Sequence, residues 1–596
     1  MRKVLIANRG EVALRVVRAC RDAGLESVAI YADQDADLPF VHAADNAVPL
    51  HGSAPSQTYL DANRVLNVAI RTQTDAVHPG YGFLAEDPDF AQAVVDAGLT
   101  WVGPPPDVIR LLGDKVSARA LAASAGIRVL PGSPESVTDP AEVAAFAERY
   151  GFPIAIKATH GGGGRGMRVA RDMATAAELL ASARREAAGA FGHDSCFLES
   201  YVERARHVEA QVLADCYGAV AVIGSRDCSL QRRFQKLIEE APAPFLTTRQ
   251  RSELAQAAEV ICRTGRYVNA GTVEFLLSPA GELTFLEVNT RLQVEHTVTE
   301  ETSGLDLVRA QFQLAAGQRL EAALDHSGTA AWPVPVERHS IQLRINAEDP
   351  DAGFVPTTGV LTSFVPPTGP GVRVDVGVRE GNSVDGRFDS LLAKLVVTGR
   401  SRTEAIERVR RALGEFEIAG VSTTVPFLIK VLGEPAFAAP TAEQFGVHTR
   451  WVEEGQLPTL SQRAAGSRAA HEPGAGTTVR VRVGSRWLAV DVPGLASAAG
   501  GPVAAERMMA AAPPVLSDGE SSAETLTAPM QGTVTMVAVT EGERVIAGQV
   551  LVVVEAMKME NPVLAPHAGV VSTIRVTAGD VVAQGTHLCH VRPVGH

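Results

Sequence analysis

Cysteine is scarce in this sequence and follows no recognisable pattern. The 596 residues include six cysteines, Cys20, Cys196, Cys216, Cys228, Cys262 and Cys589. None of them belongs to a C-x-x-C pair or to another metal-like spacing, which argues against a zinc-ribbon site or a disulfide framework. Such scattered cysteines are typical of small hydrophobic side chains in a reducing compartment.

A basic excess and a long apolar run are also missing. The formal net charge is −13, which argues against general nucleic-acid binding. No stretch reaches the ~20 consecutive apolar residues of a membrane span, and the apolar run that follows Met1 is too short for a signal peptide. We therefore expect a cytoplasmic protein that contacts neither nucleic acid nor a membrane.

The sequence does have length and an ordinary globular composition. Hydrophobic residues make up 46% of the chain and charged residues 21%, so large buried cores are available. Single hydrophobic cores rarely grow beyond about 250–300 residues. A chain of 596 residues is therefore expected to contain several domains.

The start of the chain alternates between strand and helix patterns. Val4–Ala7 is a buried-strand run, Val12–Ala23 is amphipathic, and Ser27–Tyr31 is a second strand pattern. This alternation predicts a doubly wound α/β domain. The turn Asn8–Glu11 lacks the G-x-G-x-x-G spacing, so it does not support a dinucleotide site.

The C-terminal segment contains an internal repeat. Ala528–Val534 recurs as Ala565–Val571, a shift of 37 residues (565 − 528). Gly542 and Gly548 recur with the same shift, at positions 579 and 585. Glycines at turns between valine-rich strands predict a β-sandwich of two similar halves. Lys558 then falls at the hairpin where the first half turns back.

A segment dominated by Ala, Gly, Pro and Ser, Leu495–Thr527, precedes this repeat. Its composition predicts a flexible linker, and its length corresponds to a root-mean-square span of roughly 30 Å. Such a span suits a domain that travels between two separate sites. Thr477–Val492 alternates like a small strand pair, which we interpret as a docking element for a partner.

Lys558 stands between Met557 and Met559 at the predicted hairpin tip. A lysine at such a tip is ordinarily a solvated charge, but an exposed pair of methionines is unusual and suggests a surface that another protein reads. An amide on this amine would carry a prosthetic group on a long arm. With the repeat, Glu555–Glu560 resembles the biotin carboxyl carrier domain. Lipoyl domains share that fold, but their modified lysine typically lies in an Asp-Lys-Ala context.

A glycine-rich loop, Gly161–Gly166, follows the predicted strand Ile154–Lys157. The backbone N–H groups of such a loop can approach phosphate oxygens, and Lys157 and Lys115 add cations suited to a nucleotide. The loop lacks the G-K-[ST] ending of a Walker A motif. By itself it could equally be a connector.

Polar and apolar residues alternate along Glu287–Glu295. Period two would place carboxylates, an amide and a guanidinium on one side of an extended segment. A solvated strand face is the alternative, but the preceding predicted strand, Thr272–Leu277, carries Glu274 among apolar neighbours, and a buried carboxylate needs a cation. We therefore predict an all-oxygen Mg2+ site formed by Glu274, Glu287 and Asn289.

A dense run of cations and amides, Arg226–Lys236, suits an anion, although by itself a surface basic patch is the better explanation. Taken together, these motifs resemble the ATP-grasp biotin carboxylase component of biotin-dependent carboxylases. The resemblance extends from Met1 to about Arg450. It rests on several motifs in order, Ile6–Glu11, His78–Leu84, Gly161–Gly166, Glu239–Pro244 and Arg344–Pro350.

The resemblance implies an α/β multi-domain chain. A Rossmann-like N-terminal domain would span residues 1–113, followed by an ATP-grasp domain at 114–317 with a mobile lid at about 131–203. A mixed α/β C-terminal carboxylase domain would follow at 333–450. A linker that includes the strand pair would span 451–525, and an all-β sandwich of the biotinyl/lipoyl type would span 526–593.

The resemblance also implies a set of site residues. The ATP-binding residues would be Lys115, Lys157, Gly163, Gly164, Glu199, Ser200, Tyr201, Val202, His207, Gln231 and Phe234. Bicarbonate would be bound by Lys236, Arg291, Gln293 and Val294, and Mg2+ or Mn2+ by Glu274, Glu287 and Asn289. The catalytic residues would be Lys236, Arg291, the general base Glu295, and Arg344 facing the ureido oxygen of biotin. Lys558 would be the biotinylation site.

The implied activity is ATP-dependent carboxylation of biotin on Lys558 with bicarbonate as substrate. A separate carboxyltransferase (beta) subunit would then carboxylate an acyl-CoA, with acetyl- or propionyl-CoA expected, in fatty-acid or propionate metabolism. Methylcrotonyl-CoA, long-chain acyl-CoA and pyruvate are alternatives, because acyl choice resides with the partner. Biotin protein ligase would be a transient partner, and the chain would form homo-oligomers within a larger alpha/beta complex. A catalytically silent carrier or scaffold is an alternative of a different class.

Three residues depart from the family pattern. Phe234 stands where many relatives have His, Thr297 where Pro is usual, and Ser200 where Lys or Arg is common. A polar contact of residue 234 with the nucleotide would be lost. None of the proposed chemical groups is missing.

Overall fold

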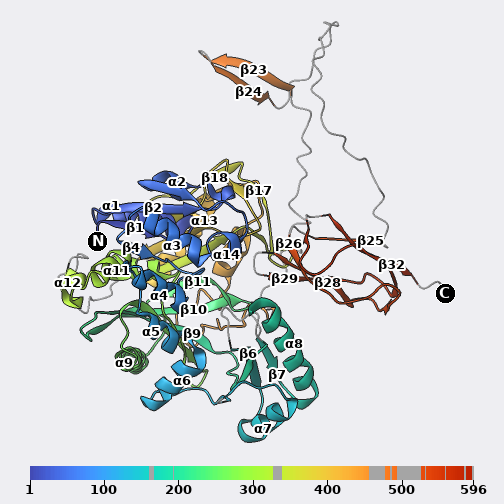
Figure 1. Ribbon diagram of the computed structural model, residues 1–596, viewed down its shortest axis with the longest axis horizontal. Coiled ribbons are helices and arrows are strands. Elements are labelled where there is room, and N and C mark those ends of the chain that lie inside the picture. Colours follow the sequence, from blue (N-terminus) through green and yellow to red (C-terminus); the bar gives the residue numbers. More distant parts are fainter. Residues whose placement is uncertain are drawn as a thin grey trace.

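The computed structural model describes residues 1–133, 135–159, 167–191, 194–325, 338–455, 477–483, 486–492, 525–529, 532–556, 559–582 and 585–593. Gly163, Gly164 and Lys558, three of the predicted site residues, lie outside these ranges. Figure 1 shows one large body, in blue to light brown, and a smaller C-terminal sandwich in red.

The N-terminal domain contains a five-stranded parallel sheet in the order β3-β2-β1-β4-β5. Its strands are β1 (Lys3–Ile6), β2 (Glu26–Tyr31), β3 (Asn46–Pro49), β4 (Ala76–His78) and β5 (Thr100–Trp101). Its helices are α1 (Gly10–Asp22), α2 (Pro39–Ala43), α3 (Ala62–Arg71), α4 (Pro88–Asp96) and α5 (Pro106–Gly113). The predicted doubly wound start is confirmed.

The strand order of this sheet reverses at β1. Ligands of doubly wound sheets bind in the crevice that opens at such a point, beyond the carboxyl ends of the strands. The loops that follow β1 and β4 carry Asn8, Arg9 and Tyr81, and all three line the main cavity of the molecule. The carboxyl edge of this sheet therefore borders the cavity, where a ligand of such a fold would bind.

The predicted lid contains a small sheet of its own, in the order β7-β6-β8. The strands are β6 (Ile154–Ala158), β7 (Arg168–Ala170) and β8 (Cys196–Ser200), and helices α7 (Pro140–Tyr150) and α8 (Met173–Phe191) pack against them. Asp139 and Glu142 form a capping box that fixes the start of α7. Figure 1 shows this layer, in teal, projecting from the lower part of the large body.

One eight-stranded antiparallel sheet forms the centre of the large body. Its order is β13-β12-β9-β10-β11-β14-β21-β19. The strands are β9 (Arg206–Ala214), β10 (Val220–Arg232), β11 (Gln235–Ala241), β12 (Asn269–Leu277), β13 (Leu283–Asn289), β14 (His339–Asn346), β19 (Val372–Val376) and β21 (Leu391–Gly399). Because β11 pairs with β14, the sheet runs without a break through the ATP-grasp and C-terminal domains that the sequence separated.

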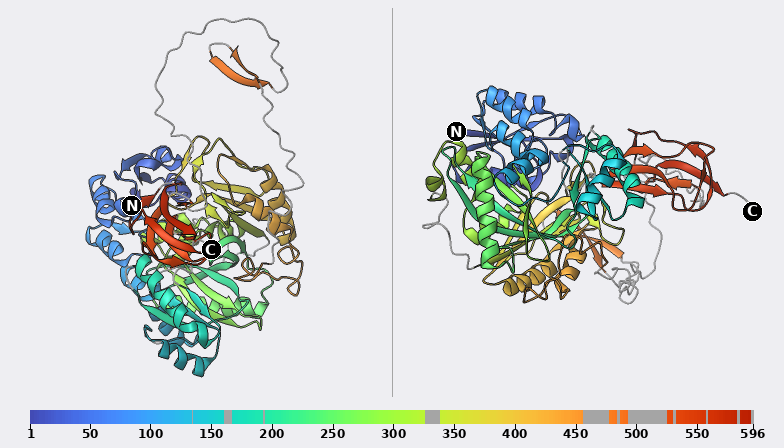
Figure 2. Two further views of the ribbon diagram at one scale, coloured as in Figure 1. Left: turned by 90° about the vertical axis from the view of Figure 1, so that its right-hand side faces the viewer. Right: turned by 90° about the horizontal axis from the view of Figure 1, so that it is seen from below.

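Helices cover this sheet and connect its parts. They are α6 (Lys115–Ser124), α9 (Thr248–Thr264), α10 (His296–Ser303), α11 (Leu307–Ala315), α12 (Leu320–Asp325), α13 (Arg402–Glu415) and α14 (Val425–Gly433). The short strand pairs are β15 (Glu348–Asp349) with β16 (Val355–Pro356), β17 (Gly359–Val360) with β20 (Ser383–Val384), and β18 (Ser363–Val365) with β22 (Glu417–Ala419). Figure 2 shows the N-terminal domain, the sheet and the C-terminal helices as one continuous body. Among the described residues, no helix is long and apolar enough to cross a membrane.

The C-terminal sandwich consists of two four-stranded sheets, β25-β32-β30-β27 and β29-β28-β26-β31. The strands are β25 (Thr525–Thr527), β26 (Gly532–Val537), β27 (Arg544–Val545), β28 (Val550–Ala556), β29 (Met559–Leu564), β30 (Gly569–Ile574), β31 (Val581–Val582) and β32 (His587–Pro593). The 37-residue shift carries β26, β27 and β28 onto β30, β31 and β32, and thereby carries one sheet onto the other. The predicted sandwich of two similar halves is confirmed.

The hairpin that would carry the prosthetic group is formed by β28 and β29. These strands pair in antiparallel fashion, with Ala556 opposite Met559. Met557 and Lys558, which join them, lie outside the described residues. The predicted hairpin is therefore confirmed by the strands on either side of position 558, and the role of Lys558 stays a prediction.

Three segments differ from the sequence-based prediction. Thr525–Thr527, predicted as the end of the linker, is strand β25, because it pairs with β32 and buries Leu526. Trp451, predicted as the first linker residue, is 3% exposed and packs in the C-terminal core. The polar run after Asn289 is not extended, since β13 ends there and a turn leads into α10.

The predicted strand pair within Thr477–Val492 is confirmed as β23 (Thr477–Val483) and β24 (Arg486–Val492). Its role as a docking element stays a prediction. Most of the predicted linker, residues 493–524, lies outside the described residues.

Candidate active site

A cavity of about 560 Å3 lies between the N-terminal domain, the lid and the central sheet. This volume is typical of a site for a nucleotide-sized molecule. Many of the described site residues predicted from the sequence line it together: Lys115, Lys157, Glu199, Ser200, Tyr201, Val202, His207, Gln231, Phe234, Lys236, Glu274, Glu287, Asn289, Arg291, Gln293, Val294 and Arg344. Glu295 is fully buried and contacts two of these lining residues, Lys236 and Arg344.

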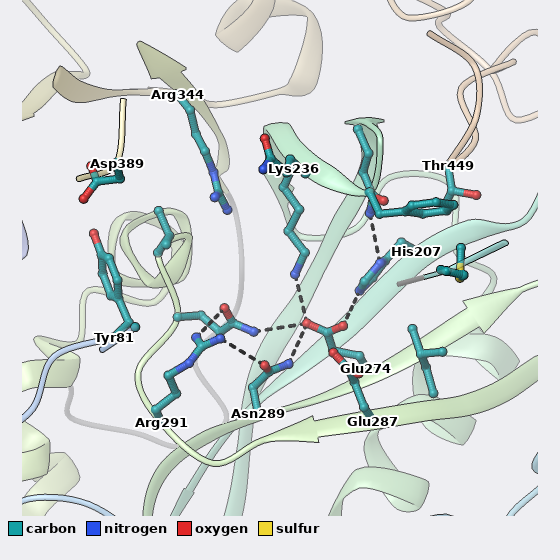
Figure 3. Close-up of a pocket in the computed structure, with 18 of the residues that line it drawn as sticks. Tyr81, His207, Lys236, Glu274, Glu287, Asn289, Arg291, Arg344, Asp389 and Thr449 are labelled. Carbon is teal, nitrogen blue, oxygen red and sulfur yellow. Dashed lines mark hydrogen bonds and ion pairs between the residues drawn. The ribbon is translucent and has the colours of Figure 1, made fainter. Parts of the chain in front are cut away.

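Two neighbouring strands present the predicted metal ligands on one face. In the antiparallel register of β12 and β13, Glu274 lies opposite Glu287 and Thr272 lies opposite Asn289. Opposed residues of paired strands point to the same side of a sheet, and so do residues two apart along one strand. The register therefore gathers Glu274, Glu287 and Asn289 at one wall of the cavity, as Figure 3 shows.

Glu274 is the centre of a hydrogen-bond network on this wall. Its Oε1 accepts from Asn289 Nδ2 at 2.8 Å, from Lys236 Nζ at 2.9 Å and from Gln293 Nε2 at 3.1 Å. Its Oε2 lies 2.8 Å from His207 Nε2. Burial alone would raise the pKa of Glu274, but the charges of Lys236 and His207 hold it well below its usual value. The carboxylate is thus kept ionised in a buried position.

Lys236 brings three buried carboxylates together. Its Nζ donates to Glu209 Oε2 at 2.8 Å, to Glu274 Oε1 at 2.9 Å and to Glu295 Oε1 at 2.7 Å. Burial would lower the pKa of this amine, but the three carboxylates raise it well above its usual value. A permanent cation at this point can receive an anionic substrate or a developing negative charge.

Glu295 is held between two cations. Lys236 contacts its Oε1, and Arg344 Nη2 lies 3.0 Å from its Oε2. Burial would raise the pKa of Glu295, but Lys236 and Arg344 together keep it below the usual value. Glu295 therefore stays deprotonated in the neutral range and has the form that a general base requires.

Arg291 is fixed by partners on three of its nitrogens. Its Nε donates to Glu86 Oε2 at 2.9 Å, its Nη1 to Gln293 Oε1 at 2.9 Å and its Nη2 to Asn289 Oδ1 at 3.1 Å. The turn that follows β13 brings Arg291 and Gln293 back toward the carboxylates. The predicted convergence of these polar groups is therefore correct, although the extended geometry behind the prediction is wrong.

The lid side of the cavity carries further cations. Lys115 Nζ lies 3.2 Å from Glu287 Oε2, and Lys157 forms an ion pair with Glu199 at the end of β8. His207 Nδ1 and Gln231 Nε2 are 3.0 Å apart. All of these groups line the cavity, and the sequence predicts that they bind the nucleotide or, for Glu287, the metal ion.

The donor set suits a hard divalent cation. Two carboxylates and one amide oxygen, from Glu274, Glu287 and Asn289, are oxygen ligands of the kind that Mg2+ prefers. They face the same cavity as Lys115 and Lys157, so an ion held there would also reach the phosphates of a nucleotide. The residues present therefore fit Mg2+ or Mn2+.

Domain families match nearly the whole chain. Residues 1–109 match "Biotin carboxylase, N-terminal domain" and residues 342–454 match "Biotin carboxylase C-terminal domain". Residues 114–323 match "Carbamoyl-phosphate synthase L chain, ATP binding domain", and residues 524–591 match "Biotin-requiring enzyme". The biotin-dependent acyl-coenzyme A carboxylase alpha3 subunit of Mycobacterium leprae is 51% identical over 568 residues, which cover 94% of this chain and 93% of that protein.

The chain belongs to the biotin-dependent carboxylases.

Other relatives of this carboxylase are named for acceptors other than an acyl-CoA. One of the pyruvate carboxylase subunits of Methanothermobacter thermautotrophicus is 43% identical, covering 76% of this chain and 89% of that protein. The biotin carboxylase domain of 2-oxoglutarate carboxylase from Hydrogenobacter thermophilus, solved with MgADP, ADP and bicarbonate, matches with a TM-score of 0.72 and 40% identity. That match covers 76% of this chain and 98% of the solved one. The chain is thus an alpha subunit that joins a biotin carboxylase to a biotin carrier domain.

Sequence reasoning missed three acidic residues of this carboxylase site. Glu209 and Glu239 are fully buried and contact Lys236 and Arg344 respectively, while Glu86 accepts from Arg291. A signal existed for Glu209, because polar residues alternate with apolar ones along β9 in the run His207–Gln211. The local sequence around Glu86 carries no comparable signal.

Two departures from the family pattern lie in the cavity wall of this carboxylase. Phe234 lines the cavity at the two-residue turn between β10 and β11, where Arg233 and Phe234 have φ angles of 47° and 64°. Ser200 lines it at the end of β8. The third departure, Thr297, lies in the first turn of α10 beside Glu295.

Proposed function

We propose that the chain uses ATP to activate bicarbonate and carboxylates biotin carried on Lys558. A separate carboxyltransferase subunit would then transfer the carboxyl group to an acyl-CoA, with acetyl-CoA or propionyl-CoA as the substrate. The observation that carries the proposal is the placement of Glu295, which is ionised, fully buried and held between Lys236 and Arg344. A silent carrier would have no use for a buried carboxylate held by two cations.

Glu295 acts as the general base in this proposal. It removes the proton of bicarbonate, which Arg291, Gln293 and Val294 hold beside Lys236. The freed oxygen attacks the γ-phosphorus of ATP, the bond from that phosphorus to ADP breaks, and carboxyphosphate forms. Carboxyphosphate then separates into CO2 and phosphate. Lys115 and Lys157 counter the negative charge that the phosphates carry through this step.

Two groups that the site would bind supply the remaining chemistry. Mg2+ held by Glu274, Glu287 and Asn289 would neutralise charge on the β- and γ-phosphates. Biotin would supply the ureido nitrogen that bonds to CO2, and the phosphate released from carboxyphosphate would take the proton that this nitrogen loses. Arg344 lines the cavity and is placed to donate hydrogen bonds to the ureido oxygen of biotin, where negative charge develops.

The carrier domain implies two macromolecular partners in this proposal. Biotin protein ligase attaches biotin to Lys558, and the carboxyltransferase subunit receives its cargo. The match with the alpha3 subunit over nearly the whole chain supports an acyl-CoA as final acceptor. Methylcrotonyl-CoA, long-chain acyl-CoA and pyruvate are the competing acceptors, because relatives of this chain include methylcrotonoyl-CoA and pyruvate carboxylases. We further propose that alpha subunits pair with one another in the alpha/beta complex.

Hydrolysis of ATP by the full chain tests the first half of the proposal. We expect release of phosphate that requires bicarbonate and rises when free biotin is added. Absence of turnover with all substrates present would favour a silent carrier. The mass of the peptide that contains Lys558 separates a biotinyl from a lipoyl group.

A panel of acyl-CoA substrates tests the second half. The native carboxyltransferase subunit is purified together with the chain, and the complex is supplied with ATP, labelled bicarbonate and one acceptor at a time. Incorporation of label into acetyl-CoA or propionyl-CoA supports the proposal. If label appears only in methylcrotonyl-CoA, a long-chain acyl-CoA or pyruvate, that compound is the acceptor, and the proposal of acetyl-CoA or propionyl-CoA is wrong.

A further inference from the structure

Thr297 occupies a position where the family pattern has proline. It lies in the first turn of α10, directly after the N-cap residue Glu295 and His296. The first N–H groups of a helix have no partner inside the helix, so proline is readily accepted there. Helix α10 therefore does not require threonine at this point, and the hydroxyl group needs another explanation.

The hydroxyl of Thr297 orients a buried amide. Thr297 and Gln342 are both 0% exposed, and Thr297 Oγ1 donates to Gln342 Oε1. The other end of the amide, Gln342 Nε2, donates to Glu239 Oε2 at 3.1 Å. If the amide were reversed, its oxygen would face the carboxylate and repel it. A donor at Thr297 thus favours the orientation that supplies Glu239 with a hydrogen bond.

Glu239 connects this amide to Arg344. Its Oε1 accepts from Arg344 Nε at 2.6 Å. In the register of β11 and β14, Glu239 lies opposite Gln342, and Arg344 follows Gln342 by two residues on the same face of β14. Gln342 and Arg344 therefore hold the two oxygens of one carboxylate, and the position of each depends on the other.

These contacts form a closed ring. Arg344 Nη2 lies 3.0 Å from Glu295 Oε2, and Glu295 precedes Thr297 by two residues. The ring therefore runs from Thr297 through Gln342, Glu239 and Arg344 to Glu295 and returns along the backbone. Burial raises the pKa of Glu239 above its usual value, while Arg344 opposes this shift. Loss of the hydrogen bond from Gln342 would further disfavour the ionised form of Glu239, which is the form that binds Arg344.

We infer that Thr297 is a positioning residue, which holds Arg344 in place for biotin through Gln342 and Glu239. The inference rests on the proposed function, in which Arg344 faces biotin. Thr297 itself does not line the cavity, so it acts on the reaction only through the ring. This predicts an effect on the biotin-dependent step that is larger than any effect on ATP binding.

The test compares Thr297→Val with the full wild-type chain. Valine has nearly the same shape but no donor. We expect kcat/KM for free biotin to fall about three- to tenfold while KM for ATP stays within about twofold, which is the effect of one buried neutral hydrogen bond. Thr297→Ser, which keeps the hydroxyl, should restore the wild-type value. Thr302→Val is the matched control, because Thr302 bonds to backbone carbonyls of the same helix and lies outside the ring.

Two further variants make the result decisive. Thr297→Pro introduces the residue of the family pattern and should behave like Thr297→Val, so it replaces that variant if valine prevents folding. On a Gln342→Met background, Thr297→Val should cause no further loss, because the two residues act as one unit.

Several results would overturn the inference. One is a Thr297→Val variant in which kcat/KM falls equally for biotin and for ATP and Tm is lower. Others are an unchanged kcat/KM for biotin in Thr297→Val and a reduced one in Thr297→Ser. The last is a fall in kcat/KM for biotin in Thr302→Val as large as that in Thr297→Val. A wild-type chain without bicarbonate-dependent turnover would instead overturn the proposed function, and this inference with it. A wild-type chain that turns over normally beside an unaffected Thr297→Val would overturn the inference alone.

Discussion

At the scale of single residues, each charged group of the site has several partners, and neighbouring groups have partners in common. Lys236 serves three carboxylates, and Glu274 receives hydrogen bonds or ion pairs from Lys236, His207, Asn289 and Gln293. Each buried charge is therefore compensated by several partners, which is the condition for keeping charges inside a protein. Removing one group changes the electrostatic environment of the others.

Replacing the general base should stop the chemistry and spare nucleotide binding. We expect Glu295→Gln to lower bicarbonate-dependent ATP hydrolysis at least about a hundredfold, because an amide cannot accept the proton of bicarbonate. ATP affinity, measured by calorimetry, should change little, since Glu295 contacts Lys236 and Arg344, neither of which is among the predicted ATP-binding residues. Glu301→Gln, a change on the same helix outside the cavity, is the control. Retained hydrolysis in Glu295→Gln would assign the base to another residue.

Replacing Phe234 by His should improve nucleotide binding. Phe234 lies in a tight turn with a φ of 64°, a conformation in which His is more common than most residues. The imidazole would regain a polar contact with the nucleotide, so we expect KM for ATP to fall about three- to tenfold with little change in kcat. Phe234→Leu, which adds no polar group, should not lower KM. An unchanged KM in Phe234→His would show that this turn does not contact the nucleotide.

At the scale of helices and strands, buried ion pairs join elements from different domains. Glu300 on α10 binds Arg15 on α1 and Arg373 on β19, each at 2.9 Å. Glu240 on β11 binds His339 on β14 at 2.8 Å and Arg402 at the start of α13 at 2.7 Å. These contacts lie where the ATP-grasp, N-terminal and C-terminal parts meet, so they fix the walls of the cavity relative to one another.

The Glu240 ion pair should give the protein a defined pH dependence of stability. Burial would raise the pKa of Glu240, but Arg402 and His339 lower it from 4.5 to about 2. A carboxyl whose pKa is lowered by folding stabilises the protein above its unfolded pKa, and this contribution is lost as the pH falls through the folded pKa. Glu240 should therefore stabilise the protein fully at pH 7 and lose that contribution between about pH 4.5 and pH 2.

The variant Glu240→Gln tests this dependence. We expect it to lower the free energy of unfolding by about 3 kcal/mol at pH 7, measured as a fall in Tm. The difference from wild type should begin to narrow only below about pH 4.5. Glu407→Gln, on the exposed side of α13, should match wild type at every pH. A Tm difference between Glu240→Gln and wild type that stays constant down to about pH 3 would mean that packing, and not charge, explains the loss.

At the scale of the whole molecule, the chain separates a large catalytic body from a small carrier. The sandwich has its own buried core, which includes Val534, Leu551 and Val591, and the hairpin of β28 and β29 extends from one of its sheets. A small domain whose predicted attachment lysine follows one strand of a pair and precedes the other suits a carrier that delivers one group to two sites.

Removing the attachment lysine should uncouple the two parts of the molecule. Arginine at position 558 cannot form the amide, so we expect Lys558→Arg to carry no biotin by mass spectrometry. Hydrolysis of ATP with added free biotin should stay within about twofold of wild type, as for a typical surface change. Carboxylation of acyl-CoA in the presence of the partner subunit should be lost. Lys430→Arg on α14 is the control, and biotin retained in Lys558→Arg would place the attachment site elsewhere.

Local patterns predicted much of this architecture. The 37-residue repeat indicated the two-half sandwich because each glycine turn and each strand depends on neighbours close in sequence. The placement of Glu274, Glu287 and Asn289 on one face could likewise be predicted, because the alternation of side chains along a strand is a local property. The extended geometry assumed beyond Asn289 failed, because the turn into α10 is stabilised by packing of that helix on β10, β11 and β14.

The sequence by itself determined the domain order, and it predicted the carrier lysine and the residue types of the site. These follow from motifs and periodicities that act over a few residues. Only the tertiary structure decided that β11 pairs with β14 in one sheet, that Glu209 joins Lys236, and that Thr297 reaches Arg344 through Gln342 and Glu239. These partners lie tens of residues apart in the chain, and their contacts arise because burial forces each charge and each polar group to find a partner across strands.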